Sequence, residues 1–205
     1  MSNPMNRQRL VKIGMTVLTF LGLVALVAVG GIVWTIKSTF DSATQEITDI
    51  KRYQEIRSQF DPAWALVKHF PYDIPTDATN VHLYFLPGFL QGTTIFQLKM
   101  KLPPKKITSL QSQYRPLAKR RYKWGSKNNS PTEYICPTND GNWTIRYDYN
   151  CYTCGNKNQS FLPTYEILVL EDTRGGSECR WNHAEHYGVA IDSSASEIVY
   201  WVEAW

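Results

Sequence analysis

One cysteine and two histidines near the C-terminus have the residue types of a metal site. Cys179, His183 and His186 fall within eight consecutive residues, and thiolate sulfur and imidazole nitrogen are ligands that zinc prefers. On a helix, a three-residue interval would put both rings on one face, but Tyr187-Gly188 begins an extended run, where the rings would point in opposite directions. We therefore expect a polar loop with no metal or cofactor, and keep a metal or catalytic site near His183 and His186 as the alternative.

The four cysteines follow the pattern C-x14-C-x2-C-x24-C, at positions Cys136, Cys151, Cys154 and Cys179. An even number of cysteines in an oxidising compartment predicts two disulfides, with three possible pairings. The chain-entropy model favours the two pairings that close loops of roughly 15 to 28 residues, each worth about 3 kcal/mol, over a bond from Cys151 to Cys154. A redox-active C-x-x-C is the alternative, but such a motif normally begins a helix, and the residues around this one favour a turn.

The compartment of these residues depends on the N-terminal segment. Residues 13–36 carry no charge, and as a helix they would extend about 36 Å, enough to cross a bilayer. Three basic residues precede the run, Arg7, Arg9 and Lys12, whereas only Lys37 follows it closely. The positive-inside rule therefore predicts a single-pass signal anchor with residues 1–12 in the cytoplasm. A cleaved signal peptide is the alternative, although its apolar region is usually shorter.

Residues 37–60 are predicted to form a helical stalk. Phe40, Ala43, Ile47 and Ile50 recur at three- and four-residue intervals, as on one face of a helix. The stripe is too short to predict a coiled-coil dimer, for which three or four heptads are needed. A helix that packs on its own domain is the other interpretation.

Residues 61–205 are predicted to form one α+β domain outside the cytoplasm, mostly antiparallel and rich in β-strand. In NVHLYFL and TIFQLKMKL, apolar residues alternate with polar ones on either side of a Pro87-Gly88 turn, which predicts two strands. The chain ends in YGVAID, SSAS and EIVYWVEAW, which predicts a hairpin with Val189 and Ile191 facing Ile198 and Tyr200.

The middle of the domain carries one helical pattern and further strand patterns. From Pro104, the spacing of Ile107, Leu110 and Tyr114 is helical, and Pro116 bends or ends the helix. TEYIC, WTIRYDY and YEILVLE follow as short strand patterns. Because strands and helices do not alternate regularly, an α+β domain is expected instead of a wound α/β one.

The formal charge of +4 conceals a separation of charge along the chain. We call residues 99–127 the basic stretch, because it contains ten lysines and arginines and no acid, whereas acids dominate residues 128–205. The basic stretch can face lipid headgroups or an acidic partner. Alternatively, it pairs with the acidic C-terminal half of its own chain.

No sequence motif assigns a reaction. G-x-S-x-G, H-E-x-x-H, the phosphate-binding G-x-x-x-x-G-K and the dinucleotide-binding G-x-G-x-x-G are all missing from the sequence. We therefore name no catalytic residue and do not expect an enzyme. A site assembled from distant residues would leave no such motif.

Two stretches resemble a known group of proteins: FPYDIPTDATNVHLYFLPGFLQGTTIFQLKMKLP and the closing YGVAIDSSASEIVYWVEAW, together about a quarter of the chain. They are similar to uncharacterised bacterial membrane-anchored proteins that share a Pro-Gly-Phe-Leu-Gln-Gly turn and a final hairpin. The resemblance implies a bacterial origin and no catalytic residues.

Taken together, these patterns predict a single-pass membrane protein whose domain lies in the periplasm, a lumen or the cell exterior. Its expected role is binding, as an accessory protein or a subunit of a membrane or envelope complex, with a protein partner and no nucleic acid. The candidate partner surface consists of Pro87, Gly88, Phe89, Leu90, Arg120 and Arg121.

Overall fold

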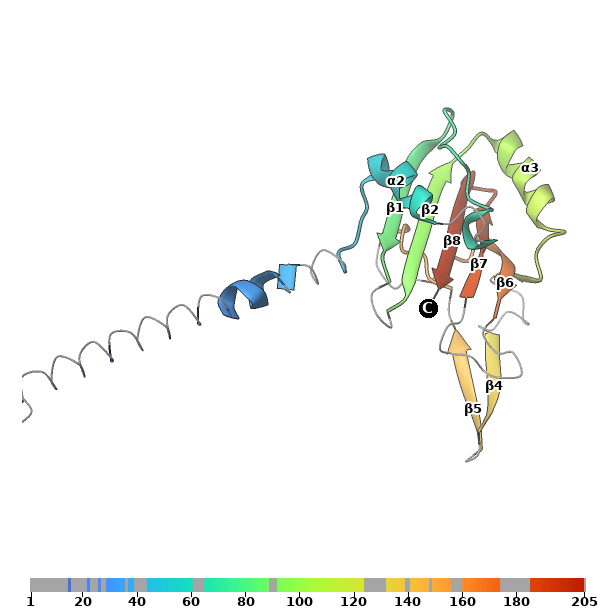
Figure 1. Ribbon diagram of the computed structural model, residues 1–205. Coiled ribbons are helices and arrows are strands. Elements are labelled where there is room, and N and C mark those ends of the chain that lie inside the picture. Colours follow the sequence, from blue (N-terminus) through green and yellow to red (C-terminus); the bar gives the residue numbers. More distant parts are fainter. Residues whose placement is uncertain are drawn as a thin grey trace, which may run out of the picture. The chain divides into compact units, whose positions relative to one another are not determined.

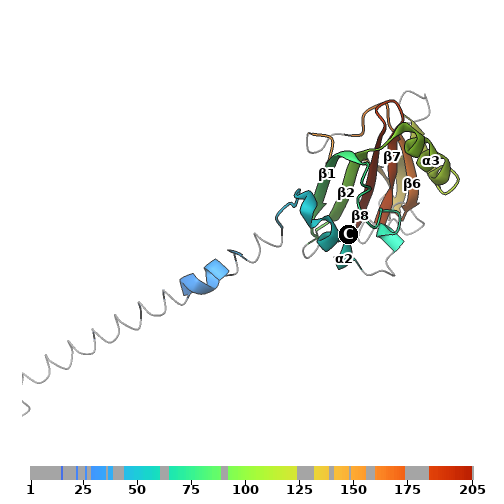
Figure 2. The same cartoon turned by 90° about the horizontal axis from the view of Figure 1, so that it is seen from above.

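The computed structural model places the two ends of the domain's sequence in one antiparallel sheet. The strand order is β1-β2-β8-β7-β6-β3, and every neighbouring pair is antiparallel. Figure 2 shows β8 between β2 and β7, with β1 and β6 farther out. The strands are β1 (Thr79–Leu86), β2 (Thr94–Lys101), β3 (Arg120–Lys123), β6 (Glu166–Asp172), β7 (Glu185–Asp192) and β8 (Glu197–Ala204).

The structure describes residues 15, 22, 26, 29–35, 37–38, 44–60, 65–88, 92–123, 132–138, 141–147, 149–155, 160–173 and 185–204, with the backbone alone for 132–138 and 141–147. The chain divides into two units, Met1–Thr44 and Gln45–Trp205. A separate hairpin in the second unit pairs β4 (Thr132–Thr138) with β5 (Gly141–Tyr147).

The predicted α+β class and its mostly antiparallel sheet are confirmed. The terminal hairpin also has the predicted register, because Val189 lies opposite Tyr200 and Ile191 opposite Ile198. The helix predicted from Pro104 is α3 (Pro104–Tyr114), with Pro at its first turn, where a missing N–H costs no helical hydrogen bond.

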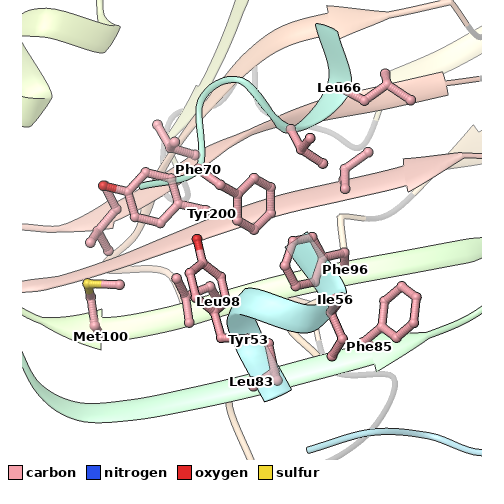
Figure 3. Close-up of a cluster of buried hydrophobic side chains, with 14 of the residues drawn as sticks. Tyr53, Ile56, Leu66, Phe70, Leu83, Phe85, Phe96, Leu98, Met100 and Tyr200 are labelled. Atoms are coloured by element: carbon pink, nitrogen blue, oxygen red, sulfur yellow. The ribbon is translucent and has the colours of Figure 1, made fainter. Parts of the chain in front are cut away.

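One face of the sheet carries the main hydrophobic core. Over it lie α2 (Tyr53–Gln59), the 3-10 turn η2 (Ala65–Val67) and α3 (Figure 1). Tyr53 and Ile56 of α2 pack against Phe96 of β2, whose ring also stacks on Phe70 at a centroid distance of 4.5 Å (Figure 3). We call this the helical face.

The stalk prediction is wrong for residues 44–52. Ile47 exchanges two backbone hydrogen bonds with Phe85 of β1, at 2.8 and 2.9 Å, so the chain there extends along the sheet edge. Asp49 is extended and caps a new 3-10 turn, η1 (Ile50–Arg52), by accepting from the Lys51 N–H. The three- and four-residue spacing reflects packing on the domain itself, since Ile47 and Ile50 both contact the core. The compact unit therefore begins at Gln45, before the predicted boundary at residue 61.

The predicted membrane span lies mostly outside the described residues. Its described part includes Val29–Thr35, which is helical. Within the residues that the structure describes, no helix combines the length and the apolar character needed to cross a bilayer.

A neutral histidine is built into the helical face. His69 Nε2 lies 3.1 Å from the carbonyl oxygen of Trp201, and its ring stacks on Tyr187. Burial lowers the pKa of His69 to about 4, although its hydrogen bonds to backbone oppose that shift. The neutral ring must therefore donate its Nε2 proton to the carbonyl, and Nδ1 is buried without a hydrogen-bond partner.

We predict that His69 makes the domain acid-sensitive. Between a pKa near 6.5 in the unfolded chain and about 4 in the folded one, only the unfolded chain binds the proton, so the free energy of unfolding falls as the pH falls through this window. The loss is at most about 3 kcal/mol. Urea unfolding from pH 7 to 4 should show a slope that His69→Gln makes shallower, while Glu197, Glu166 and Asp192, whose pKa values are lowered in the folded chain, keep part of the slope below about pH 5. The variant His82→Gln, at an exposed histidine, is the control and should keep the slope of the unmodified protein. Equal slopes in the unmodified protein and in both variants would contradict the role assigned to His69.

Candidate functional site

The two parts of the predicted partner surface lie on opposite edges of the sheet. Pro87 and Gly88 follow β1, whereas Arg120 and Arg121 belong to β3. Five strand spacings separate these edges, which is about 24 Å at the usual distance between neighbouring strands. The structure therefore does not bring these residues together. Phe89 and Leu90 lie outside the described residues.

Gly88 has a local structural role in the connection from β1 to β2. Its N–H donates to Thr94 Oγ1 at 3.1 Å. A Cβ at this position would lie 2.4 Å from the same oxygen and 2.8 Å from the carbonyl oxygen of Gly92. Only glycine fits so close an approach, so the contacts with Thr94 and Gly92 explain the glycine at this position.

The basic stretch pairs with acids of its own chain. Lys99 and Lys101 of β2 both contact Glu197 of the neighbouring β8, and Lys99 Nζ lies 3.1 Å from a Glu197 oxygen. Arg115 of α3 binds Glu166 at 2.8 Å. Among the described residues, the stretch also forms the ion pairs Lys106–Asp77, Lys119–Glu171 and Arg120–Asp172. The alternative of pairing with the acidic C-terminal half is confirmed for these residues except Lys106, whose partner Asp77 precedes the stretch.

Glu197 is shared by two lysines and is itself buried. Its carboxylate accepts a hydrogen bond from the Tyr165 hydroxyl at 2.5 Å. Burial acts to raise the pKa of Glu197, but the hydrogen bond from Tyr165 and the charges of Lys99 and Lys101 outweigh it and hold the pKa below its ordinary value. The carboxylate is therefore charged at neutral pH and joins β2 to β8 on the second face of the sheet.

His186, the described member of the proposed histidine pair, lies on β7 with 2% of its surface exposed. Its Nε2 is 3.1 Å from an oxygen of Glu203, opposite on β8, and its ring contacts the rings of Tyr149 and Trp201. Neither ring nitrogen meets hydrogen-bond geometry, and Trp201 Nε1 is also buried without a partner. His183 lies outside the described residues. In the part of the chain that the structure describes, no three His, Cys, Asp or Glu residues are placed to hold a metal ion.

The preferred disulfide pairings are wrong, because Cys151 is bonded to Cys154. The chain turns back on itself at this point, with the Cys154 N–H donating to the Cys151 carbonyl at 3.3 Å. The turn brings the two Cα atoms to 5.3 Å, within the usual range for a disulfide. A ranking by loop length takes no account of such local geometry. Cys179 and the side chain of Cys136 lie outside the described residues.

The disulfide belongs to a segment that crosses the second face of the sheet. We call residues 149–155 the cover segment. Tyr149 packs on Trp201 of β8, at a centroid distance of 5.3 Å, and Tyr152 stacks on Tyr84 of β1 at 5.0 Å. Since β1 and β8 are separated by β2, the segment runs across three strands. Cys151, between the two tyrosines, is completely buried.

A single glutamine of β2 fixes the middle of the cover segment. The Gln97 side chain donates to the carbonyl oxygen of Asn150 at 2.7 Å and accepts from the Tyr152 N–H at 2.9 Å. Only 1% of Gln97 is exposed, so both backbone groups depend on it for their hydrogen bonds. The alternation in TIFQLKMKL predicts that Gln97 lies on the polar face of the strand, and it reveals neither the burial nor the role of this residue. The one signal is an uncharged residue among lysines at alternate positions.

A groove opens where the cover segment reaches β1. Its volume is about 540 Å³, within the range of small-molecule and peptide sites. Residues of four segments line it: Thr48 and Ile50; Val81, His82 and Leu83 of β1; Lys99 of β2; and Tyr152, Thr153, Cys154 and Gly155. We call it the edge groove. It combines one cysteine of the disulfide, a tyrosine, a histidine and a lysine.

Comparison with known proteins adds no assignment to this geometry. No protein-family model, no curated protein and no solved structure matches the chain. The function must therefore be argued from the domain itself.

We predict that Gln97→Leu destabilises the domain by about 2 to 4 kcal/mol, because it leaves the buried Asn150 carbonyl and Tyr152 N–H unpaired. Chemical denaturation measures the loss, and hydrogen exchange should show faster exchange of the Tyr152 amide. Gln113→Leu, on the exposed side of α3, is the matched control and should change stability by less than about 0.5 kcal/mol. Unchanged exchange at Tyr152 would contradict the role assigned to Gln97.

Proposed function

We propose that the protein is a single-pass membrane protein whose domain, held outside the cytoplasm, binds an extended segment of a protein partner along the free edge of β1. The observation that carries the binding role is that this edge already pairs with Ile47 of its own chain, beside the edge groove. The domain would act as an accessory protein or subunit of a membrane or envelope complex.

The Cys151–Cys154 disulfide supports a location outside the cytoplasm. Disulfides persist mainly in oxidising compartments, and cytosolic thiols are kept reduced. The described part of the N-terminal run is consistent with a lipid environment. Ile32, Val33 and Trp34 are exposed on a helix, and the Thr35 hydroxyl is satisfied within that helix by the Gly31 and Ile32 carbonyls.

The edge of β1 offers backbone groups to a partner. In an antiparallel strand, alternate residues direct both their N–H and C=O toward the same neighbour. Phe85 directs its groups toward Ile47, so Leu83, two residues earlier, directs its own toward the same edge. Among the described residues, no turn or loop bonds to the Leu83 backbone there. An added strand is a common way for a domain to bind an extended peptide.

The edge groove supplies contacts for the side chains of such a segment. Beyond Ile47, the chain turns away from the sheet into η1, and the groove lies between this segment and β1. Tyr152 offers a half-buried ring, and His82 is an exposed polar side chain of β1. Alternate side chains of an extended partner would therefore meet the groove while its backbone pairs with β1.

The membrane location predicts a specific pattern of chemical labelling. In intact bacterial spheroplasts that express the full chain, a membrane-impermeant lysine reagent should modify the exposed Lys105 of α3. It should reach Lys12 only after lysis, because the positive flank stays in the cytoplasm. Peptide mass spectrometry reads both sites, and the protein should resist alkaline extraction from membranes. Protection of Lys105 until lysis would overturn the proposed orientation.

The binding edge is tested by site-specific photocrosslinking in cells. A photoreactive amino acid in place of His82, in the edge groove, should give crosslinked protein bands of discrete mass. The same residue in place of the exposed Gln113 of α3 is the control and should give none of these bands. Equal crosslinking from both positions, or none from His82, would contradict a partner at the β1 edge.

A further inference from the structure

The two residues of the disulfide differ in their exposure to solvent. Cys151 is completely buried, whereas Cys154 is partly exposed and lines the edge groove. A thiolate that approaches from the groove therefore reaches Cys154 before Cys151. Attack at Cys154 leaves Cys151 as the departing sulfur.

The disulfide contributes little to holding the cover segment in place. In the chain-entropy model, a loop this short is worth about 2 kcal/mol, less than the longer loops first expected. Other contacts fix the same residues independently of the bond, namely the two hydrogen bonds of Gln97 and the stacking of Tyr152 on Tyr84. The segment can therefore keep its position on the sheet when the bond is open.

The surroundings of the two sulfurs also suit exchange. The Thr153 hydroxyl lies 3.7 Å from the Cys151 sulfur, where it can donate a weak hydrogen bond to a departing thiolate. Lys99 lines the groove that Cys154 faces, and a cationic group favours a thiolate. Lys99 is shared with Glu197, which limits its effect. The groove supplies access and a modest positive charge.

We propose that Cys151–Cys154 is an exchangeable disulfide, a thiol–disulfide exchange site whose reaction partner is a protein dithiol of the oxidoreductase class. The partner's thiolate attacks the Cys154 sulfur, the Cys151–Cys154 bond breaks, and Cys151 leaves as a thiolate that takes up a proton from water. The partner's second thiolate then attacks its own sulfur in the mixed disulfide and releases Cys154. Two electrons pass from the dithiol to the cysteine pair, and the partner ends as a disulfide.

This assignment differs from a thioredoxin-like catalyst. In such catalysts the pair begins a helix, whose N-terminus stabilises the attacking thiolate. Here residues 152–155 form a turn, and Gly155 has a φ of 111°. The pair is therefore the substrate of exchange, and its state changes the wall of the edge groove. The proposal goes beyond the binding function and holds whether or not a partner strand occupies β1.

The first test measures the reduction rate of the native full-length protein in detergent by dithiothreitol, with alkylation and peptide mass spectrometry to follow Cys151 and Cys154. The native bond should be reduced within about tenfold of its rate in urea, because Cys154 is partly exposed. Protection by about a thousandfold or more would show a closed structural bond and overturn the proposal.

The second test separates the roles of the two sulfurs. The Cys151→Ser variant keeps Cys154, and the Cys154→Ser variant keeps Cys151. Cys154 should form a mixed disulfide with oxidised glutathione at least about tenfold faster than Cys151, because only Cys154 faces the groove. Equal rates, or the reverse order, would contradict attack at Cys154. Thermal unfolding checks that both variants are folded. If either variant is unfolded, the rate at which dithiothreitol reduces the unmodified protein decides whether the bond is exchangeable. Neither rate depends on membrane orientation or on a crosslinked partner, so failure here is distinct from failure of the proposed function.

Discussion

The central position of β8 is the constraint on which the rest of the domain depends. This last strand pairs with β2 on one side and β7 on the other, so residues about a hundred positions apart must come together before the sheet is complete. Its side chains alternate between two cores. Ile198, Tyr200 and Val202 face α2 and α3, whereas Val199 and Trp201 lie beneath the cover segment. One strand thus joins both layers of the molecule.

The close approach of β7 to β6 and β8 follows from the same packing. A Cβ on Gly188 would lie 2.2 Å from the Leu168 carbonyl oxygen and 3.0 Å from the Trp201 ring. The indole therefore occupies the space that a side chain on β7 would need. Trp201 in turn supports Tyr149, the first residue of the cover segment. The position of the segment that carries the disulfide is thus set by a glycine on a different strand.

Patterns of local origin were predictable from the sequence, and contacts between distant segments were not. The terminal hairpin could be predicted with its register, because the alternation of Val189 and Ile191 on one strand matches that of Ile198 and Tyr200 on the other. Ile47 and Ile50 could not be assigned, since apolar residues three apart fit a helix or two separate contacts with a core. The pairing of the basic stretch with acids depended on β2 meeting β8, which the sequence left open.

The candidate site was predictable only in its residue types. The cysteines, His186 and the lysines of β2 were all visible in the sequence, but their grouping depends on where the chain crosses the sheet. The sequence favours longer loops over the Cys151–Cys154 bond, because so short a loop gains little entropy and tends to be strained. The sequence does not show the turn that brings the two Cα atoms to 5.3 Å. Gln97 shows the same limit, since its burial comes from the cover segment and not from its own strand.

The edges of the sheet explain why the proposed binding site and the proposed exchangeable bond lie at the same place. An unpaired edge strand attracts other strands, so domains usually shorten, charge or cover it. At one edge, β3 is only four residues long and carries the sequence RRYK. At the other, β1 has eight residues and is covered in part by Ile47. The cover segment ends beside the remaining open part, around Leu83, and places Cys154 there. If both proposals hold, a change in the bond at Cys154 would act beside the stretch of β1 that is open to another strand, and the redox state of the disulfide would have a direct physical route to partner binding.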